Sequence, residues 1–483
     1  MGAASWWEQK VSNWLPKGKT GGEALAVQQL ERLSPGAGTS GTPSAAGVAP
    51  RQFAALDAVT QRQVLKPLQA VADNTVSEVE GGRRARAFAQ WYAQASAEQR
   101  RQACVLMSER FAPDPQRIRQ AREAYEAAVG TPEEGAAEIR LRKALYSDRT
   151  RLLQRFAVFP EGMRFLVDLR AELLPQLKSE KRLLALEAEL ETLFGTWFDV
   201  AFLELRRISW DSPASLVEKL IQYEAVHDIK SWADVKNRLD SDRRCYGFFH
   251  ARLPDEPLIF VEVAFTREIA SNIVPLLDET AEAVDLNKAT TAIFYSISNT
   301  QSGLKGISFG DSLIKRVVET LKADFPQLRT FATLSPIPGF RSWYRKNAAR
   351  LLQELPDKHR RTLGRFIGFE PVTPEHIQAW LDQGPHWDAK CPGARWLLHC
   401  ASRYLGHELE QGRPVDPVAR FHLGNGARVE NIHWMADPSP KGMQQSHGMM
   451  VNYLYDLKKL DRHRRMLGEG KIPISGGVAD LSL

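Results

Sequence analysis

One unit in the middle of the chain restricts the fold more than any other feature. It runs from Ala292 to Phe340 and contains a strand, a glycine-rich loop, a helix and a second strand. Residues 292–298 form an apolar, aromatic and β-branched run of strand length. Apolar residues then recur with helical spacing over 313–321, and a second apolar run covers 330–334. This order predicts a fold in which strands and helices share one core.

The loop between the first strand and the helix contains Gly303, Gly306 and Gly310. Glycines let backbone N–H groups turn toward a ligand, and the N-terminus of the next helix carries partial positive charge. A phosphate or pyrophosphate could therefore bind there. The glycine spacing is neither the dinucleotide fingerprint nor the P-loop. From the spacing alone, a phosphate-binding loop and a loop that only turns the chain are equally good interpretations.

The length of 483 residues predicts two or more domains. Residues 1–51 hold many small residues and are predicted to be a disordered tail, because they bury too little apolar surface to offset the entropy of ordering. Residues 52–195 are dominated by helix-forming residues and predict an α-helical bundle with an oligomerisation role. Helix breaks are expected at Gly81-Gly82, 113–115, 130–135 and 160–162.

Residues 196–483 differ in composition and predict an α+β domain. The runs 245–251 and 257–265 are predicted to be antiparallel neighbours, joined by the turn-prone segment 253–257. They precede the strand that starts at Ala292, and helical patterns return over 341–383. The order of the strands within the sheet does not follow from the sequence.

Charge and cysteine usage limit the possible partners. The chain has 64 basic and 58 acidic residues, so its net charge of +6 suits an anionic ligand without implying nucleic acid. No apolar run approaches the roughly 18 residues of a membrane-spanning helix, so no membrane partner is expected. The four cysteines include no C-x-x-C pair, and the start lacks the apolar core of a secretory signal. We therefore expect reduced thiols and a cytoplasmic location.

A second group of motifs lies near the C-terminus, over 417–434 and 446–453. Asn425-Gly426 stands between two alternating runs, which predicts a β-hairpin. Alternation then places Phe421 and Leu423 on one face and His422 on the other, away from its apolar neighbours. An isolated histidine in a hairpin is more often structural or exposed than catalytic. The residues alone leave the role of His422 open.

Several segments, taken together, resemble the malonyl-CoA decarboxylase family. They are FYSIS at 294–298, GLKG at 303–306, LIKRVV at 313–318, LSPIPGF at 334–340, FHL at 421–423, NGA at 425–427, WMAD at 434–437 and SHGMMVNY at 446–453. The resemblance implies an N-terminal helical domain followed by a catalytic domain like the GCN5-type acetyltransferases, the GNAT fold. Its specific motifs cover roughly 197–457, and the helical part resembles the family only in composition and order.

The resemblance also implies a site. In that family the serine of LSPIPGF and the histidine of FHL are catalytic partners, which carries over to Ser335 and His422. The implied reaction is the decarboxylation of malonyl-CoA to acetyl-CoA and CO2, in which these two residues handle the carboxylate, the enolate and the proton. At Ser308 the chain departs from the glutamate of animal members, so no carboxylate role is expected there.

The glycine loop would carry the CoA pyrophosphate on its backbone N–H groups. The expected substrate-binding residues are Lys305, Gly306, Ile307, Ser308, Phe309, Gly310, Asp311, Ser335 and His422. Lys315 and Arg316, on the helix that follows, are candidates for the remaining phosphates.

The resemblance implies no cofactor besides the CoA thioester substrate, and it implies a homotetramer. The chain contains no H-E-x-x-H motif and no Cys/His spacing that would hold a metal, so no metal site is expected.

Two other functions stay open. One is a GCN5-like N-acyltransferase that uses an acyl-CoA and an amine, and the other is a non-catalytic acyl-CoA-binding protein.

Overall fold

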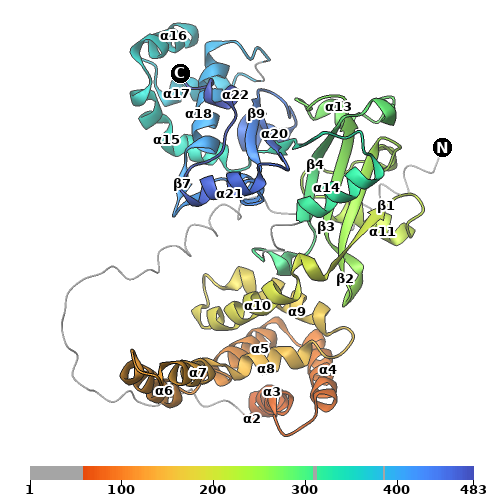
Figure 1. Cartoon of the computed structure of the whole chain (residues 1–483), viewed down its shortest axis with the longest axis vertical. Helices are drawn as coiled ribbons and strands as arrows, with labels where there is room; N and C mark the ends of the chain where they lie inside the picture. The colour runs from red at the N-terminus through yellow and green to blue at the C-terminus, as the bar shows by residue number, and fades with distance from the viewer. Residues whose placement is uncertain (1–57, 308–312, 385–386) are drawn as a thin grey trace.

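The structure is a computed structural model that describes residues 58–307, 313–384 and 387–483. Figure 1 shows a helical part at the bottom, red to yellow, below a larger part in which helices surround a sheet. The predicted tail, 1–51, lies outside the described residues. The helices of the first part are α2 Ala58–Thr60, α3 Lys66–Ala72, α4 Glu78–Gln94, α5 Ala97–Arg110, α6 Pro115–Ala128, α7 Glu134–Leu145, α8 Asp148–Phe156, α9 Gly162–Leu173 and α10 Leu184–Trp197.

Side-chain caps fix where several of these helices begin. The Ser77 hydroxyl accepts from the backbone N–H of Glu80 at the start of α4. Ser96 and Gln99 form a reciprocal capping box at the start of α5. The segments around 113–115 and 160–162 separate helices, as the sequence predicted.

The break predicted at Gly81-Gly82 is wrong, because both glycines lie in the first turns of α4 and are buried. A Cβ atom on Gly81 would lie 2.3 Å from the Arg155 guanidinium, and one on Gly82 would lie 2.7 Å from the Val158 side chain. The pair therefore lets α4 pack closely against α8 and the turn that follows it. Close packing, and not a turn, explains these two glycines.

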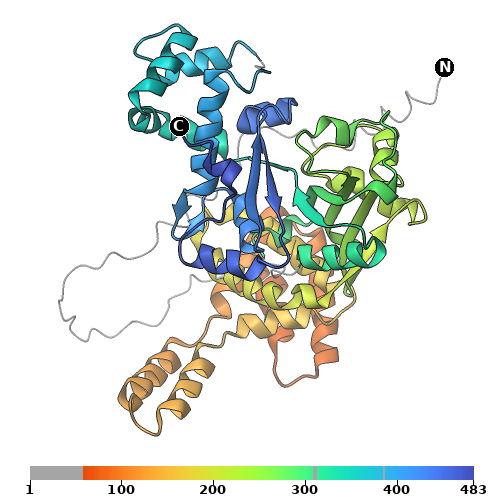
Figure 2. The same ribbon diagram turned by 45° about the horizontal axis from the view of Figure 1, so that its top comes forward.

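Helices α6 and α7 form a hairpin that projects from the bundle, as Figure 2 shows at its lower left. These two helices bury little of their own surface, with only Ala128 and Ala137 fully buried among their described residues. Ile139, Leu145 and Tyr146 are each at least half exposed. The hairpin thus carries apolar side chains that the described chain leaves in contact with solvent.

The second part contains one sheet that has eight strands among the described residues, in the order β1-β2-β3-β4-β5-β10-β6, with β9 paired to β10. Its strands are β1 Leu203–Ile208, β2 Arg243–His250, β3 Leu253–Thr266, β4 Thr291–Asn299, β5 Thr330–Thr333, β6 Ser335–Pro336, β9 Arg428–His433 and β10 Met450–Leu454. The antiparallel β2 and β3 confirm that prediction, but β3 already begins at Leu253. The segment 253–257 is therefore strand, and the turn falls just before it.

Strands β4 and β5 are parallel, whereas their neighbours pair antiparallel. Val263, Phe294 and Thr333 lie side by side across β3, β4 and β5, and therefore share one face of the sheet. Glu262 and Ser296 are paired one position away and lie on the opposite face. The register shifts between these two pairs and leaves Tyr295 as a β-bulge in β4. The pairing of β4 with β5 ends at Phe294, although β4 continues to Asn299.

Helices cover both faces of the sheet. Helix α14, Leu313–Asp324, packs its buried side chains into the core of Val263 and Phe294. Helices α11 Ala214–Tyr223, α12 Trp232–Arg238 and α13 Val274–Leu277 contribute to the cores on the other face. A mixed α+β domain thus follows a helical one, with the antiparallel strands, the parallel pair and the intervening helix of a GNAT-like fold.

The C-terminal third adds α15 Phe340–Glu354, α16 Asp357–Ile367, α17 Pro374–Leu381, α18 Pro392–Gly406, the short β7 Leu409–Glu410 and β8 Arg413–Pro414, α19 Pro417–Gly424, α20 Pro440–Ser446, α21 Leu460–Gly468 and α22 Gly476–Ala479. The hairpin predicted around Asn425-Gly426 is wrong. The residues before it form α19, and those after it form β9, which pairs with the distant β10. Asp416 and Pro417 supply a helix start that outweighs the local alternation. No helix of the described segments is both long and apolar enough to cross a membrane.

Candidate active site

The parallel strands bring two segments of the predicted site to the same edge of the sheet. The glycine loop follows the carboxyl end of β4, and Ser335 lies two residues beyond the end of β5. Because parallel strands end at the same edge, both segments leave the sheet on one side, where ligands of open parallel sheets commonly bind. The loop starts further out than Ser335, because β4 continues over 295–299 beyond its last pair with β5. Ser335 pairs with Val451 of β10, and this pairing fixes its position.

The structure brings Ser335 and His422 together although 87 positions separate them. Ser335 Oγ lies 3.4 Å from His422 Nε2 and donates to Thr333 Oγ1 at 2.8 Å. Thr333 Oγ1 also accepts from the backbone N–H of Tyr453 at 3.1 Å. Ser335 is 6% exposed and His422 is 3% exposed, so the contact lies inside the protein. His422 does not face solvent from a hairpin, as the alternation predicted, but is buried on α19.

Two tyrosines of the segment that contains β10 hold the imidazole. The Tyr453 ring stacks on the His422 ring with centroids 4.7 Å apart, and Tyr455 Oη lies 2.7 Å from His422 Nδ1. Burial raises the pKa of the Tyr455 hydroxyl well above its usual value, so this group keeps its proton and can donate to Nδ1. The imidazole proton then sits on Nε2, toward Ser335. We call Ser335, Thr333, His422 and Tyr455 the hydroxyl–imidazole network.

Burial also lowers the pKa of His422 to about 3. A buried imidazole without a carboxylate partner is neutral at physiological pH, because desolvation disfavours the charged form. Neutral His422 can donate one hydrogen bond and accept another. It can therefore pass a proton between a hydroxyl and a reacting atom, or polarise a carbonyl, while the imidazole itself is uncharged before the reaction.

The position of His422 depends on how α19 begins. Asp416 caps this helix, and its Oδ1 accepts from the N–H groups of Val418 and Ala419, at 2.9 Å each. Tyr404 of α18 donates to Asp416 Oδ2 at 3.2 Å. These bonds anchor the first turn of α19, and the helix then carries His422 to the sheet.

Of the predicted loop residues, the structure describes Lys305, Gly306 and Ile307. Lys305 and Gly306 are exposed, Ile307 is buried, and Gly306 has a φ of +82°, which favours glycine. The other four, Ser308, Phe309, Gly310 and Asp311, lie outside the described residues.

The two basic candidates on α14 have different surroundings. The Lys315 side chain is more than half exposed and lies 3.8 Å from Glu319. Arg316 donates to the carbonyl oxygens of Val200 and Leu203, at 2.7 and 2.6 Å. The described structure therefore gives Arg316 a role in holding α14 against the start of β1 and the turn before it, whereas Lys315 remains accessible to a ligand.

Three residues of the site, Thr333, Tyr453 and Tyr455, were not predicted from the sequence. All three come from strand runs in which alternation predicts only a buried or an exposed face. A threonine two residues before Ser335 does have the same-face spacing of a strand. That spacing could have indicated Thr333, whereas no local signal places Tyr453 or Tyr455 against His422.

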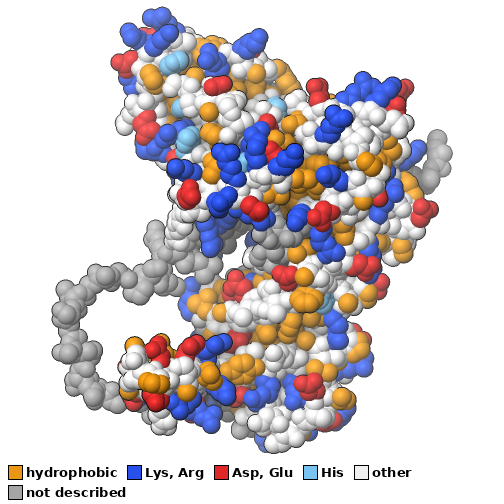
Figure 3. Space-filling view, viewed as in Figure 1, with side chains coloured by type: hydrophobic (Ala, Val, Ile, Leu, Met, Phe, Trp, Pro, Cys, Tyr) orange, Lys and Arg blue, Asp and Glu red, His pale blue; other side chains and the backbone are white. Residues whose placement is uncertain are grey.

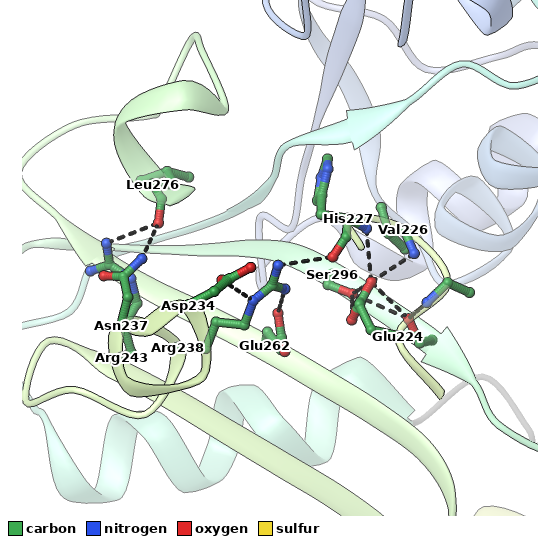
Figure 4. A network of polar contacts seen from close by, with 12 residues as sticks. Glu224, Val226, His227, Asp234, Asn237, Arg238, Arg243, Glu262, Leu276 and Ser296 are labelled. Atoms are coloured by element: carbon green, nitrogen blue, oxygen red, sulfur yellow. Dashed lines mark hydrogen bonds and ion pairs between the residues drawn. The ribbon is translucent and has the colours of Figure 1, made fainter. Parts of the chain in front are cut away.

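A second buried network occupies the opposite face of the sheet (Figure 4). Arg238 of α12 donates to Asp234 at 2.8 Å and to Glu262 of β3 at 2.7 Å. It also donates to the carbonyl oxygen of His227 at 2.8 Å. Glu224 accepts from the Ser296 hydroxyl at 2.8 and 2.9 Å and so reaches β4 from the same side. We call Arg238, Asp234 and Glu262 the ionic network.

Over the visible face of the molecule, acidic and basic side chains are interspersed and form no single-sign field (Figure 3). In the described segments, no group of three or more His, Cys, Asp and Glu side chains is placed so that it could hold a metal ion.

Comparisons with known proteins agree with this architecture. The family model of the malonyl-CoA decarboxylase C-terminal domain matches residues 201–482, and that of the N-terminal domain matches residues 111–198. The mitochondrial malonyl-CoA decarboxylase of the goose Anser anser anser is 34% identical in an alignment of 459 positions that covers 89% of each chain. The mouse enzyme is 38% identical in an alignment of 344 positions that covers 67% of this chain and 68% of that one.

Two solved structures extend the likeness to three dimensions. The malonyl-CoA decarboxylase of Rhodopseudomonas palustris has a TM-score of 0.75 at 39% identity, covering 87% of this chain and 99% of that one. That of Cupriavidus metallidurans has a TM-score of 0.70 at 42% identity, covering 88% and 99%. Both domain models, the relatives and the fold agree, and the chain belongs to the malonyl-CoA decarboxylase family.

Proposed function

We propose that the chain converts malonyl-CoA to acetyl-CoA and CO2, with Ser335 and His422 at the reacting end of the substrate. The contact between the Ser335 hydroxyl and the His422 imidazole carries this proposal. It lies beyond the end of β5, and the glycine loop leaves the same edge of the sheet from β4. A nucleotide thioester bound at that edge could place its phosphates on the loop and its acyl group beside Ser335.

The reaction needs few groups. Loss of CO2 leaves its electron pair in the enolate of the thioester, and one proton must then reach the carbon. Because the thioester carbonyl itself accepts the electrons, no added electron-sink cofactor is required, and we propose a cofactor-free reaction. The protein must hold the carboxylate out of the thioester plane, stabilise the enolate oxygen and supply the proton.

The hydroxyl–imidazole network can meet these needs. Ser335 can hydrogen-bond the malonyl group, and neutral His422 can donate from Nε2 to the enolate oxygen or relay a proton to the carbon. Tyr455, bonded to Nδ1 at 2.7 Å, orients the ring and keeps the imidazole proton on Nε2. The site is buried, so these hydrogen bonds act with little competition from water.

The remaining parts of the proposal concern binding and assembly. The backbone of the loop that includes Lys305, Gly306 and Ile307 would contact the CoA pyrophosphate.

Self-association into a homotetramer is supported by the exposed apolar side chains of the α6–α7 hairpin and is tested by light scattering. All four cysteines are free thiols, which supports a reducing, cytoplasmic location.

Incubation of the purified protein with malonyl-CoA alone, with a chelator present, tests the activity. We expect acetyl-CoA and CO2 in equal amounts. Parallel reactions with acetyl-CoA and a set of amines test acyl transfer. Absence of CO2 release from malonyl-CoA, or amine acylation in its place, would contradict the proposal.

A further inference from the structure

A buried arginine of the helical domain, Arg170 of α9, bonds to the backbone of the glycine loop. Its Nη1 donates to the carbonyl oxygens of Gly303 and Lys305, at 2.8 and 2.9 Å. Its Nη2 donates to Glu187 of α10 at 2.7 Å. The Arg170 side chain is only 3% exposed, so these charge-assisted bonds are shielded from water.

Two more contacts press the loop onto α9. Arg164 donates to the side-chain oxygen of Gln301 at 2.5 Å and is itself held by Asp168. A Cβ atom on Gly303 would lie 1.9 Å from the carbonyl oxygen of Val167, so only glycine permits this approach. The helical domain therefore contacts the loop along its first half, as far as Lys305, the first of the residues expected to bind phosphate.

The contact to Lys305 determines which way the next peptide group faces. A trans peptide directs its C=O and its N–H in opposite directions. Because the Lys305 carbonyl points at Arg170, the N–H of Gly306 points away from α9. Without Arg170, the carbonyl oxygens of Gly303 and Lys305 would be free to turn, and their partial negative charge would repel a phosphate.

We propose that Arg170 is a positioning residue for CoA binding, which acts from the helical domain by holding the Lys305 carbonyl so that the N–H of Gly306 faces the pyrophosphate. This inference rests on the proposed function of the loop. It gives the helical domain a part in substrate affinity in addition to packing, although that domain supplies no group of the hydroxyl–imidazole network.

The test compares Arg170→Met with Arg155→Met. Arg155 is a second buried arginine of the helical domain, and it donates to the carbonyl oxygens of Ser77 and Val76, far along the chain from the loop. We expect Arg170→Met to raise KM for malonyl-CoA, and Kd for CoA measured by calorimetry, roughly tenfold, with kcat within about threefold of the wild type. Arg155→Met should lower the melting temperature without changing KM.

A substrate without the pyrophosphate separates positioning from general damage. With S-malonyl-pantetheine, Arg170→Met and the wild type should have the same kcat/KM. An unchanged KM for malonyl-CoA, or an equal loss on both substrates, would overturn the inference. If Arg170→Met does not fold, Arg170→Lys gives the same readouts, because lysine keeps the charge beside Glu187 but not the forked contact. The calorimetric Kd tests the inference even if the protein does not release CO2.

Discussion

Two buried polar networks lie on opposite faces of the same sheet and use different chemistry. The hydroxyl–imidazole network consists of groups that are neutral at physiological pH, because burial lowers the pKa of His422 to about 3. The ionic network places Arg238 between two carboxylates, and Arg238 and Glu262 are at most 1% exposed. Both networks tie helices to strands of one sheet, so they differ in charge and not in the kind of elements that they join.

The contrast shows what each network can do. Fixed charges in the interior stabilise the protein only while each has its partner, so the ionic network tolerates little change. Neutral hydroxyls and an imidazole can exchange protons without leaving a charge stranded. We therefore infer that the ionic network sets the shape of the sheet and that the hydroxyl–imidazole network performs the chemistry.

The largest expected effect is on stability. Arg238→Met leaves Asp234 and Glu262 without their cation, which should cost about 3 to 5 kcal/mol in the free energy of unfolding. The molecules that remain folded should keep their kcat. Urea unfolding and active-site titration measure the two quantities. The double variant Arg238→Met/Glu262→Gln should recover part of the stability, and no recovery would argue against the charge explanation.

The next effect is on the rate. Ser335→Ala or His422→Asn should lower kcat by about two to three decades, equal to roughly 3 to 4 kcal/mol in the barrier, because each removes a donor from the reacting centre. CoA binding and the melting temperature should change little. His463→Asn, which changes a buried histidine bonded to the Gly426 carbonyl, is the matched control. Full activity in either variant would remove that residue from the mechanism.

The two networks should respond to pH with opposite signs. His422 binds a proton in the unfolded chain below about 6.5 but in the folded protein only near 3, so stability falls as the pH drops from 6.5 to about 3. Burial raises the pKa of Glu262 to about 7 from 4.5, so its contribution falls as the pH rises over that window. Each group changes stability by at most about 1.4 kcal/mol per pH unit.

Unfolding at a series of pH values checks these signs. Relative to the wild type, His422→Asn should flatten the loss of stability toward acid, and Glu262→Gln should flatten the loss toward neutral pH. A His422→Asn curve parallel to that of the wild type would contradict the neutral imidazole.

The smallest effect is expected at the edge of the hydroxyl–imidazole network. Tyr455→Phe removes the bond to Nδ1 but keeps the ring, and should lower kcat about tenfold, or 1.4 kcal/mol. Tyr453→Phe, which keeps the stacked ring, should have a smaller effect, and equal losses in both variants would argue against a special role for the Tyr455 hydroxyl.

The sequence predicted local features well where one short segment decides them. The strand at 292–298, the helix after it and the antiparallel pair before it follow from periodicity, and all are present. Predictions from local sequence patterns were wrong where packing outweighs local preference. Gly81-Gly82 lies inside a helix because α8 approaches closely, and Asn425-Gly426 follows a helix because Asp416 and Pro417 start one.

By itself, the sequence determined the order of the domains, the strand–loop–helix–strand unit and, through resemblance, the two residues most worth testing. Only the tertiary structure decided that Ser335 meets His422, that Thr333, Tyr453 and Tyr455 surround them, and that Arg170 holds the glycine loop. The physical reason is distance along the chain. Periodicity reports which face of an element is buried, whereas the partner across a sheet or a domain boundary depends on strand pairing and packing, which no local pattern encodes.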